Sequence, residues 1–87
     1  MKIYHCTTPK KMERYKNTGC ILSPVRGWKY LRSAENWCKK TGRTIILEME
    51  IGTAYPPPDH KPLFHSYWAD ENVKEYQIVR RKEDESN

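Results

Sequence analysis

The sequence predicts a small α+β domain in which two short helices pack on a mixed β-sheet. Its 87 residues give room for one domain with one modest core. Apolar side chains alternate along residues 44–51, which is typical of a strand with one buried face. Two other segments carry the start and stop signals of helices. We therefore expect a single domain over residues 1–80, followed by a charged, frayed tail over residues 81–87.

Residues 2–7 and 44–51 carry the most regular strand patterns. In the first segment polar residues alternate with apolar or aromatic ones, so Ile3 and His5 share one face of the predicted strand. In the second segment the odd-numbered positions from 45 to 51 are Ile, Leu, Met and Ile. This continuous apolar face predicts that the second strand lies in the interior of the sheet.

Two helices are predicted from their end signals. Thr8 is suited to cap the first helix, and Pro9 suits the first helical position, where its missing N–H costs nothing. This helix would run to about residue 17 and stop at Gly19. Ser33 is the predicted cap of the second helix, which would present Ala, Trp and Cys at positions i, i+3 and i+4 and end at Gly42.

The remaining segments have weaker patterns. Residues 20–23 are a brief apolar run ended by a proline, which favours a short strand. Residues 26–31 combine strand-like spacing of aromatic residues with a glycine typical of a turn. Residues 52–72 are rich in proline and irregular, which makes them a candidate lid or binding loop. Residues 73–79 alternate well enough to predict the last strand.

The charge of the chain is strongly asymmetric. Residues 1–43 carry eleven Lys and Arg against two acidic residues, a net +9, whereas residues 44–87 carry five against nine, a net −4. A field of this kind steers phosphate-bearing partners toward the basic half. The alternative is a solvated basic face that only confers solubility.

The cysteines and the hydropathy of the chain indicate a soluble protein of a reducing compartment, and we expect it to be cytoplasmic. Three cysteines form no C-x-x-C pair, so neither a disulfide framework nor a zinc site is predicted, and no metal cofactor is expected. Mean hydropathy is −0.97, and no segment has the roughly 20 apolar residues that a membrane span requires. The N-terminus lacks the apolar run of a signal peptide.

The standard phosphate-binding motifs do not occur in the sequence. It has no Walker loop, no G-x-G-x-x-G and no nucleic-acid signature such as an RNP motif. Lys and Arg nevertheless interleave with Tyr15, Trp28, Tyr30 and Trp37, a composition that can bind phosphates and stack bases. The alternative role of these aromatic residues is to fill the core, and Trp37 is expected there.

Four segments together resemble a known family. Residues 4–7 (Tyr-His-Cys-Thr) are followed by a helix and then by an apolar pair after glycine at residues 19–22. Residues 28–37 place aromatic residues before a helix with an alanine, and residues 74–79 place a Glu before a Tyr. In this order they resemble ADP-ribosyltransferase-like domains, which include the RNA 2′-phosphotransferases.

The resemblance implies a fold, a substrate and roles for individual residues. NAD would be the substrate, with His5 at the ribose of its adenosine portion and Tyr30 stacked on the nicotinamide ring. Glu75 would be catalytic, because a carboxylate beside the second ribose stabilises the positive charge that develops as nicotinamide leaves. Basic residues would hold the pyrophosphate. The nucleotide-binding residues implied are His5, Thr7, Arg26, Tyr30 and Arg32.

Three functions remain open from the sequence. The first is a small domain that binds an NAD- or ADP-ribose-like nucleotide, with ADP-ribosyl transfer as its activity. The second is a non-catalytic module that sequesters a nucleotide or binds nucleic acid through its basic N-terminal half. The third is an interaction protein that meets a protein partner through the loop at residues 52–72.

Overall fold

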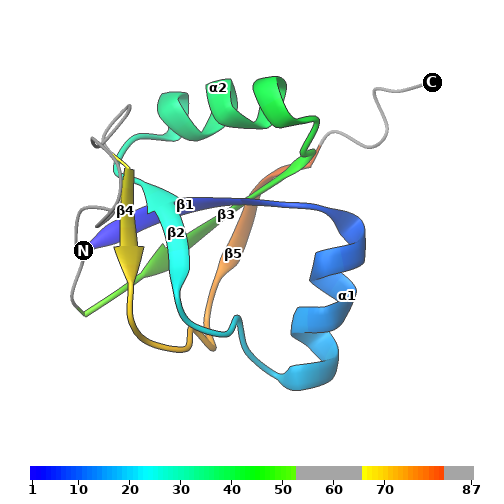
Figure 1. Ribbon diagram of the computed structural model, residues 1–87, viewed down its shortest axis with the longest axis vertical. Coiled ribbons are helices and arrows are strands. Elements are labelled where there is room, and N and C mark those ends of the chain that lie inside the picture. The colour runs from blue at the N-terminus through cyan, green and yellow to red at the C-terminus, as the bar shows by residue number, and fades with distance from the viewer. Residues whose placement is uncertain (53–65, 82–87) are drawn as a thin grey trace.

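The computed structural model describes residues 1–52 and 66–81, which form one sheet with two helices (Figure 1). The predicted α+β class with two short helices is confirmed. Along the chain the elements are β1 (Lys2–Thr7), α1 (Pro9–Thr18), β2 (Val25–Trp28), α2 (Leu31–Thr41), β3 (Ile45–Glu50), β4 (Ser66–Ala69) and β5 (Gln77–Arg81).

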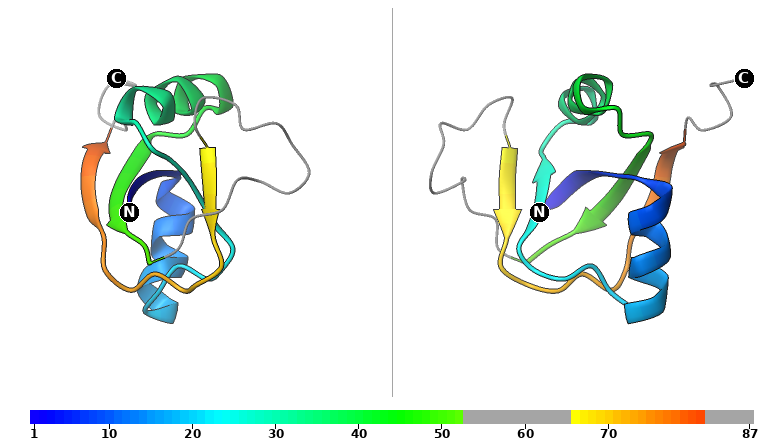
Figure 2. Two further views of the ribbon diagram at one scale, coloured as in Figure 1. Left: turned by 90° about the vertical axis from the view of Figure 1, so that its left-hand side faces the viewer. Right: turned by 45° about the vertical axis from the view of Figure 1, so that its right-hand side comes forward.

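The sheet has the strand order β4-β2-β1-β3-β5 (Figure 2). All four pairings are antiparallel, so the sheet that we expected to be mixed is antiparallel throughout the described residues. β3 pairs with β1 along its whole length and with β5 on its other side, so its predicted interior position is confirmed. The register places Cys6 opposite Ile46 and His5 opposite Leu47. The β3–β5 ladder shifts register between Ile46 and Leu47.

The two helices cover opposite faces of the sheet. Side chains alternate between these faces along each strand, so each helix packs on a different set of strand residues. On one face Met12 of α1 packs with Ile3, Ile45 and Leu47. On the other face Ala34 and Cys38 of α2 pack with Cys6, Trp28 and Ile46. The alternation predicted for β1 and β3 is therefore confirmed, and each face has its own core.

The ends of α1 agree with the prediction, whereas the start of α2 does not. The Thr8 hydroxyl accepts a hydrogen bond from the backbone N–H of Lys11 at 3.2 Å, and Gly19 ends α1 with a positive φ of 80°. The prediction that Ser33 caps α2 is wrong. The N-cap position is three residues earlier, at Tyr30, and the helix begins at Leu31, because the extended chain at Tyr30 leads directly from β2 into its first turn. Tyr30 makes no side-chain cap.

Two predicted strands are shifted along the chain. Residues 20–23 form no strand, and Ile21 makes only an isolated bridge with Val73, through two backbone hydrogen bonds of 2.8 and 2.9 Å. Pro24 has no N–H to donate to a ladder, and β2 begins directly after it. The last strand covers Gln77–Arg81 and not residues 73–79, so Glu75 precedes the strand that we expected to carry it.

Two further predictions concern the C-terminal half. Part of the region predicted to be irregular, residues 52–72, forms β4, while residues 53–65 lie outside the described residues. Arg81, which we placed in the tail, ends β5, and residues 82–87 are not described. Within residues 1–52 and 66–81, no helix is long and apolar enough to cross a membrane.

Candidate anion-binding site

A chain of three hydrogen bonds links β1 to α1 and β2. His5 Nδ1 lies 2.6 Å from the carbonyl oxygen of Arg26 and, because that oxygen can only accept, Nδ1 carries the proton. The other nitrogen, Nε2, accepts from the Tyr15 hydroxyl at 3.1 Å. The Thr7 hydroxyl in turn donates to the Tyr15 oxygen at 3.2 Å. Every member of this network is satisfied when His5 is neutral.

The surroundings of His5 also favour its neutral form. Burial lowers the pKa of the imidazole below its usual value of 6.5, and the nearby positive charges of Arg43 and Lys11 lower it further. The hydrogen bond to the Arg26 carbonyl acts in the opposite direction but is outweighed. Protonation would make Nε2 a donor and break its bond with Tyr15. His5 is therefore a neutral hydrogen-bonding group.

A cavity of about 240 Å³, here called the α1 pocket, opens beside this network. Its lining residues are His5, Lys11, Arg14, Tyr15, Thr18, Cys20, Ile21, Leu22 and Pro24. They include two basic side chains and no carboxylate. Hydroxyl, imidazole and cationic groups thus converge on one small pocket, which suits a ligand that carries both negative charge and hydrogen-bonding groups.

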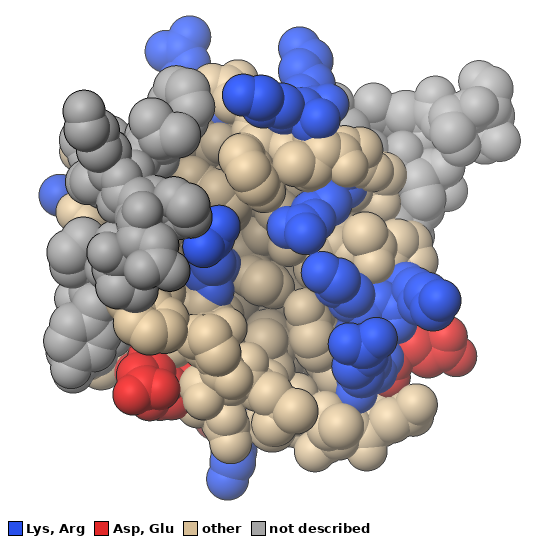
Figure 3. Space-filling view, in the orientation of Figure 1, with Lys and Arg blue, Asp and Glu red and all other residues tan. Residues whose placement is uncertain are grey.

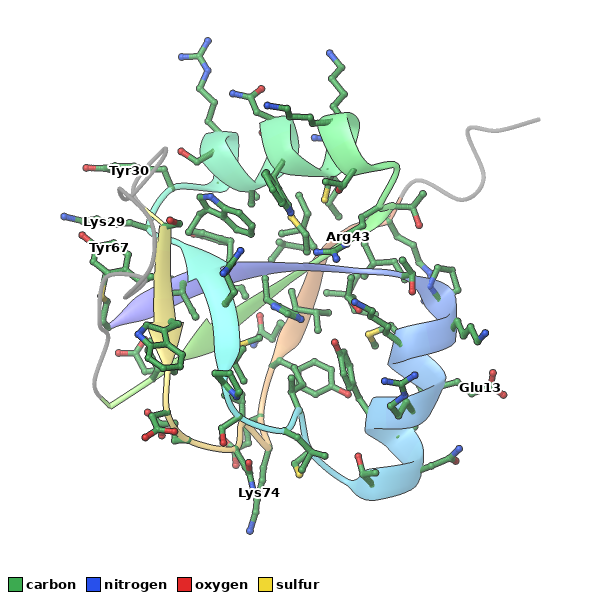
Figure 4. All side chains as sticks on the ribbon, in the orientation of Figure 1. Glu13, Lys29, Tyr30, Arg43, Tyr67 and Lys74 are labelled. Carbon is green, nitrogen blue, oxygen red and sulfur yellow. The ribbon has the colours of Figure 1, made fainter. Side chains whose placement is uncertain are left out.

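Three cations, Lys11, Arg14 and Arg43, lie close enough together to affect one another, and we call them the Arg43 cluster. Arg43 is the main cause of a lowered pKa at Lys11, with burial and Arg14 as smaller causes. Among the described residues, no ion pair joins any of the three to a carboxylate. Glu13, the one acidic residue of α1, points away from Arg43 (Figure 4). The cluster is an uncompensated positive centre.

Many basic side chains lie on the face of the molecule that Figure 3 shows. Figure 3 shows Lys and Arg over α2, below α2 and along α1, with the acidic side chains of this face at its margins. Figure 4 shows Arg43 between the two helices. Arg43 therefore lies among the basic side chains of this face.

A second cavity, of about 320 Å³, lies between α2 and strands β3 and β5, and we call it the α2 pocket. Its lining residues are Arg32, Glu35, Asn36, Cys38, Lys39, Arg43, Thr44, Ile46 and Arg80. Arg43 thus lines the α2 pocket and also exerts its charge on Lys11 and His5 at the α1 pocket. The two cavities share one cation.

The structure brings together only some of the site residues that the sequence predicted. His5 and Thr7 meet through Tyr15, and Arg26 contributes its backbone carbonyl to them. Arg32 lines the α2 pocket instead. The remaining two predicted residues lie elsewhere again.

Tyr30 and Glu75 occupy separate surroundings. Tyr30 precedes α2 with 48% of its surface exposed, and the Lys29 ammonium lies 5.6 Å from the centre of its ring. Glu75 lines a third cavity, of about 270 Å³, together with Lys2 and Glu48. This cavity shares no lining residue with the α1 pocket. His5 and Glu75 therefore do not face a common cavity among the described residues.

Cys6, the neighbour of His5 on β1, does not form a nucleophilic centre with it. Cys6 and Cys38 are buried, Cys20 is partly buried, and all three are free thiols. The Cys6 thiol donates to the Ala34 carbonyl at 3.1 Å on the sheet face opposite His5. Its pKa is raised, first by a hydrogen bond with Cys38 and then by burial. A thiol of this kind stays protonated and is a poor nucleophile.

Sequence reasoning missed the residues at the centre of this site. Lys11 and Arg14 are three positions apart on α1, and this spacing was a usable signal that they share a side of the helix. No local pattern connects them to Arg43, which the turn before β3 brings near.

Within residues 1–52 and 66–81, no group of three His, Cys, Asp or Glu side chains could hold a metal ion. Comparisons with protein-family models, curated proteins and solved structures find no match to this chain.

Proposed function

We propose that this protein binds a phosphate-bearing ligand, a nucleotide or a nucleic-acid strand, at the basic surface centred on Arg43. The observation that carries the proposal is the Arg43 cluster, whose positive charges act on one another and are joined to no carboxylate by an ion pair among the described residues. Like charges held close together raise the free energy of the folded state. A bound phosphate offsets that repulsion, and an arginine can bind it through two parallel N–H···O bonds.

The α1 pocket supplies neutral partners beside the charge. Tyr15 and the neutral His5 line the pocket next to Lys11 and Arg14. Both nitrogens of His5 are bonded within the fold, but the Tyr15 oxygen keeps a lone pair that can accept from a sugar hydroxyl. A cavity of about 240 Å³ admits a phosphate with part of a sugar. The rest of the ligand would extend along the basic face that Figure 3 shows. A ligand with phosphates and sugar hydroxyls fits this arrangement better than a purely ionic one.

Among the three functions open from the sequence, these observations favour the non-catalytic binding module. The family resemblance makes NAD a substrate and Glu75 its catalytic residue, but Glu75 and His5 line different cavities. The same resemblance keeps NAD among the ligands to test, because NAD carries a pyrophosphate. Binding therefore requires only the Arg43 cluster, whereas ADP-ribosyl transfer would also require Glu75 to approach the ligand.

The proposal is tested with Arg43→Gln and a matched control, Lys74→Gln. Lys74 is exposed and points away from the rest of the molecule at the end opposite α2 (Figure 4). Isothermal titration with ADP, NAD and a single-stranded oligonucleotide would be run for both variants and wild type at 50 and 200 mM salt. We expect Arg43→Gln to weaken binding about tenfold or more, since a charge-assisted hydrogen bond contributes about 1.5–3 kcal/mol.

Salt dependence separates the two ligand types. For an oligonucleotide, the slope of log K against log salt should decrease by about 0.7 in Arg43→Gln, because one phosphate contact is lost. A nucleotide should show a shallow slope in all three proteins. Equal ligand affinities of Arg43→Gln and Lys74→Gln would contradict the proposal. An oligonucleotide affinity of the wild-type protein that does not change with salt would contradict it as well.

A further inference from the structure

The α2 pocket has its own distinct construction. One wall is a side of α2 that carries Arg32, Glu35 and Lys39 at positions i, i+3 and i+7. Arg80 of β5 faces this wall and forms an ion pair with Glu35. The fully buried Ile46 contributes an apolar part of the lining. The pocket thus combines an apolar portion with charged walls.

The charge of this pocket is strongly positive. Four of its lining side chains are cationic, Arg32, Lys39, Arg43 and Arg80, and one is acidic, Glu35. The ion pair with Arg80 neutralises that carboxylate. Arg32, Lys39 and Arg43 remain without a carboxylate partner among the described residues, so a net charge of three surrounds the cavity.

Thr44 adds an observation that is independent of the charge. Its hydroxyl is fully buried and has no hydrogen-bond partner within the described part of the chain, although the residue lines the pocket. A buried hydroxyl without a partner destabilises a fold, because it has given up its bonds to water. Rotation of the side chain toward the pocket would let a ligand oxygen accept its hydrogen, which would remove this penalty.

We infer that the α2 pocket binds the dianionic phosphate group of a phosphomonoester, with the Thr44 hydroxyl donating to one phosphate oxygen. Such a group offers three terminal oxygens and about two negative charges, which match cations arriving from α2 and from the turn before β3. A carboxylate offers two oxygens and one charge, and would leave more of this cationic set unsatisfied. The inference rests on the proposed function only through Arg43, which lines this pocket as well.

Thr44→Val gives the sharpest test, because it removes the hydroxyl and keeps the shape of the side chain. We expect its dissociation constant for inorganic phosphate and for a nucleoside 5′-monophosphate to rise about tenfold at fixed ionic strength. Its melting temperature without ligand should equal or exceed that of wild type, since the unpartnered buried hydroxyl is gone. The matched control is Thr41→Val, whose exposed hydroxyl bonds only to the Trp37 carbonyl on α2.

Two results for Thr44→Val would overturn the inference. One is wild-type phosphate affinity in Thr44→Val, and the other is a melting temperature well below that of wild type, which would show that the hydroxyl has a partner in the fold. Arg32→Gln provides a second variant, because Arg32 is exposed and its loss leaves the core intact. It too should bind phosphate about tenfold more weakly, and unchanged affinity there would also count against the site.

Further ligands identify the source of the phosphate and separate this inference from the proposed function. Equal affinity for inorganic phosphate and the monophosphate indicates a site for the phosphate group alone, whereas tighter binding of the monophosphate indicates a nucleotide end. The methyl ester of the monophosphate, with one charge fewer, should bind more weakly, and equal binding of the unphosphorylated nucleoside would refute the site. Lys11 and Arg14 line the α1 pocket and not the α2 pocket. If phosphate affinity depends more strongly on Thr44 and Arg32 than on Lys11 and Arg14, the phosphate is bound in the α2 pocket.

Discussion

His5 should make the stability of the fold depend on pH. Its folded-state pKa is lowered by burial and by the charges of Arg43 and Lys11, so the native protein binds fewer protons than the unfolded chain just below pH 6.5. Stability then decreases as pH falls through the unfolded value and is unaffected above it. The hydrogen bonds of Nδ1 to Arg26 and of Nε2 to Tyr15 have the same consequence, because only neutral imidazole satisfies both.

The size of the effect has an upper limit. If His5 remained neutral in the fold throughout, the free energy of unfolding would fall by up to about 1.4 kcal/mol between pH 7.5 and pH 5.5. Urea titrations at both pH values measure it, and His5→Gln removes the titrating group while keeping an amide that can donate and accept. The other two histidines, His60 and His65, are the same in both proteins, so the difference between the two pH dependences isolates His5.

Two outcomes would refute this reasoning about His5. One is a pH dependence that is equally steep in His5→Gln, and the other is a wild-type protein that becomes more stable as pH falls from 7.5 to 5.5. A saturating phosphate-bearing ligand adds a check on the site. Negative charge near Arg43 and Lys11 would offset their effect on the imidazole, so the contribution of His5 to the pH dependence should shrink in the complex.

Two other predictions test the fold and the family resemblance. Gly27→Ala should lower the free energy of unfolding by about 1–3 kcal/mol in urea titrations, because the added Cβ would lie 2.6 Å from Ile3 Cδ1 and 3.0 Å from the carbonyl oxygen of Tyr4. Gly52→Ala, whose Cβ would meet no atom closer than 3.5 Å, is the matched control and should change stability little. Glu75→Gln should leave nucleotide affinity unchanged, since Glu75 lines a cavity apart from the α1 and α2 pockets. An NAD-consuming activity that falls about 100-fold or more in that variant would instead support the transferase that the resemblance implies.

The parts of the fold that follow from local chemistry could be predicted from the sequence. Thr8 and Gly19 mark the ends of α1 because capping and a left-handed turn depend on one or two residues. The alternation at residues 44–51 identified β3 because Ile45, Leu47 and Met49 all lie in the core on one face of the sheet. Elements that depend on distant partners were placed less well. β4, for example, is defined by its ladder with β2. Tyr67 and Trp68 of that strand follow a proline-rich stretch, and the sequence around them has no pattern that predicts a strand.

The candidate site was harder to predict because tertiary structure assembles it. His5 and Thr7 could be named from the sequence, but Tyr15, which joins them, was recognised only as an aromatic side chain among basic residues. Thr44 had no distinguishing signal, because its role depends on the burial of a hydroxyl beneath α2. Arg43 was one of eleven basic residues in the first half of the chain. Its effect on Lys11 becomes visible only once β1 and β3 are paired.

The distribution of ion pairs explains why the Arg43 cluster is the most informative feature of this surface. Carboxylates of β3 are paired elsewhere: Glu50 with the N-terminal amine at 3.2 Å and Glu48 with Lys2 at 3.6 Å. Glu35, the acidic residue of α2, is paired with Arg80. The described carboxylates that are paired therefore neutralise cations outside the cluster, and the repulsion around Arg43 persists in the folded protein. Because exposed pairs contribute little to stability, the fold tolerates this arrangement at small cost. An anion that binds there is attracted by three positive charges that no described carboxylate offsets, an attraction that water and salt screen but that a neutralised surface of the same composition would not offer.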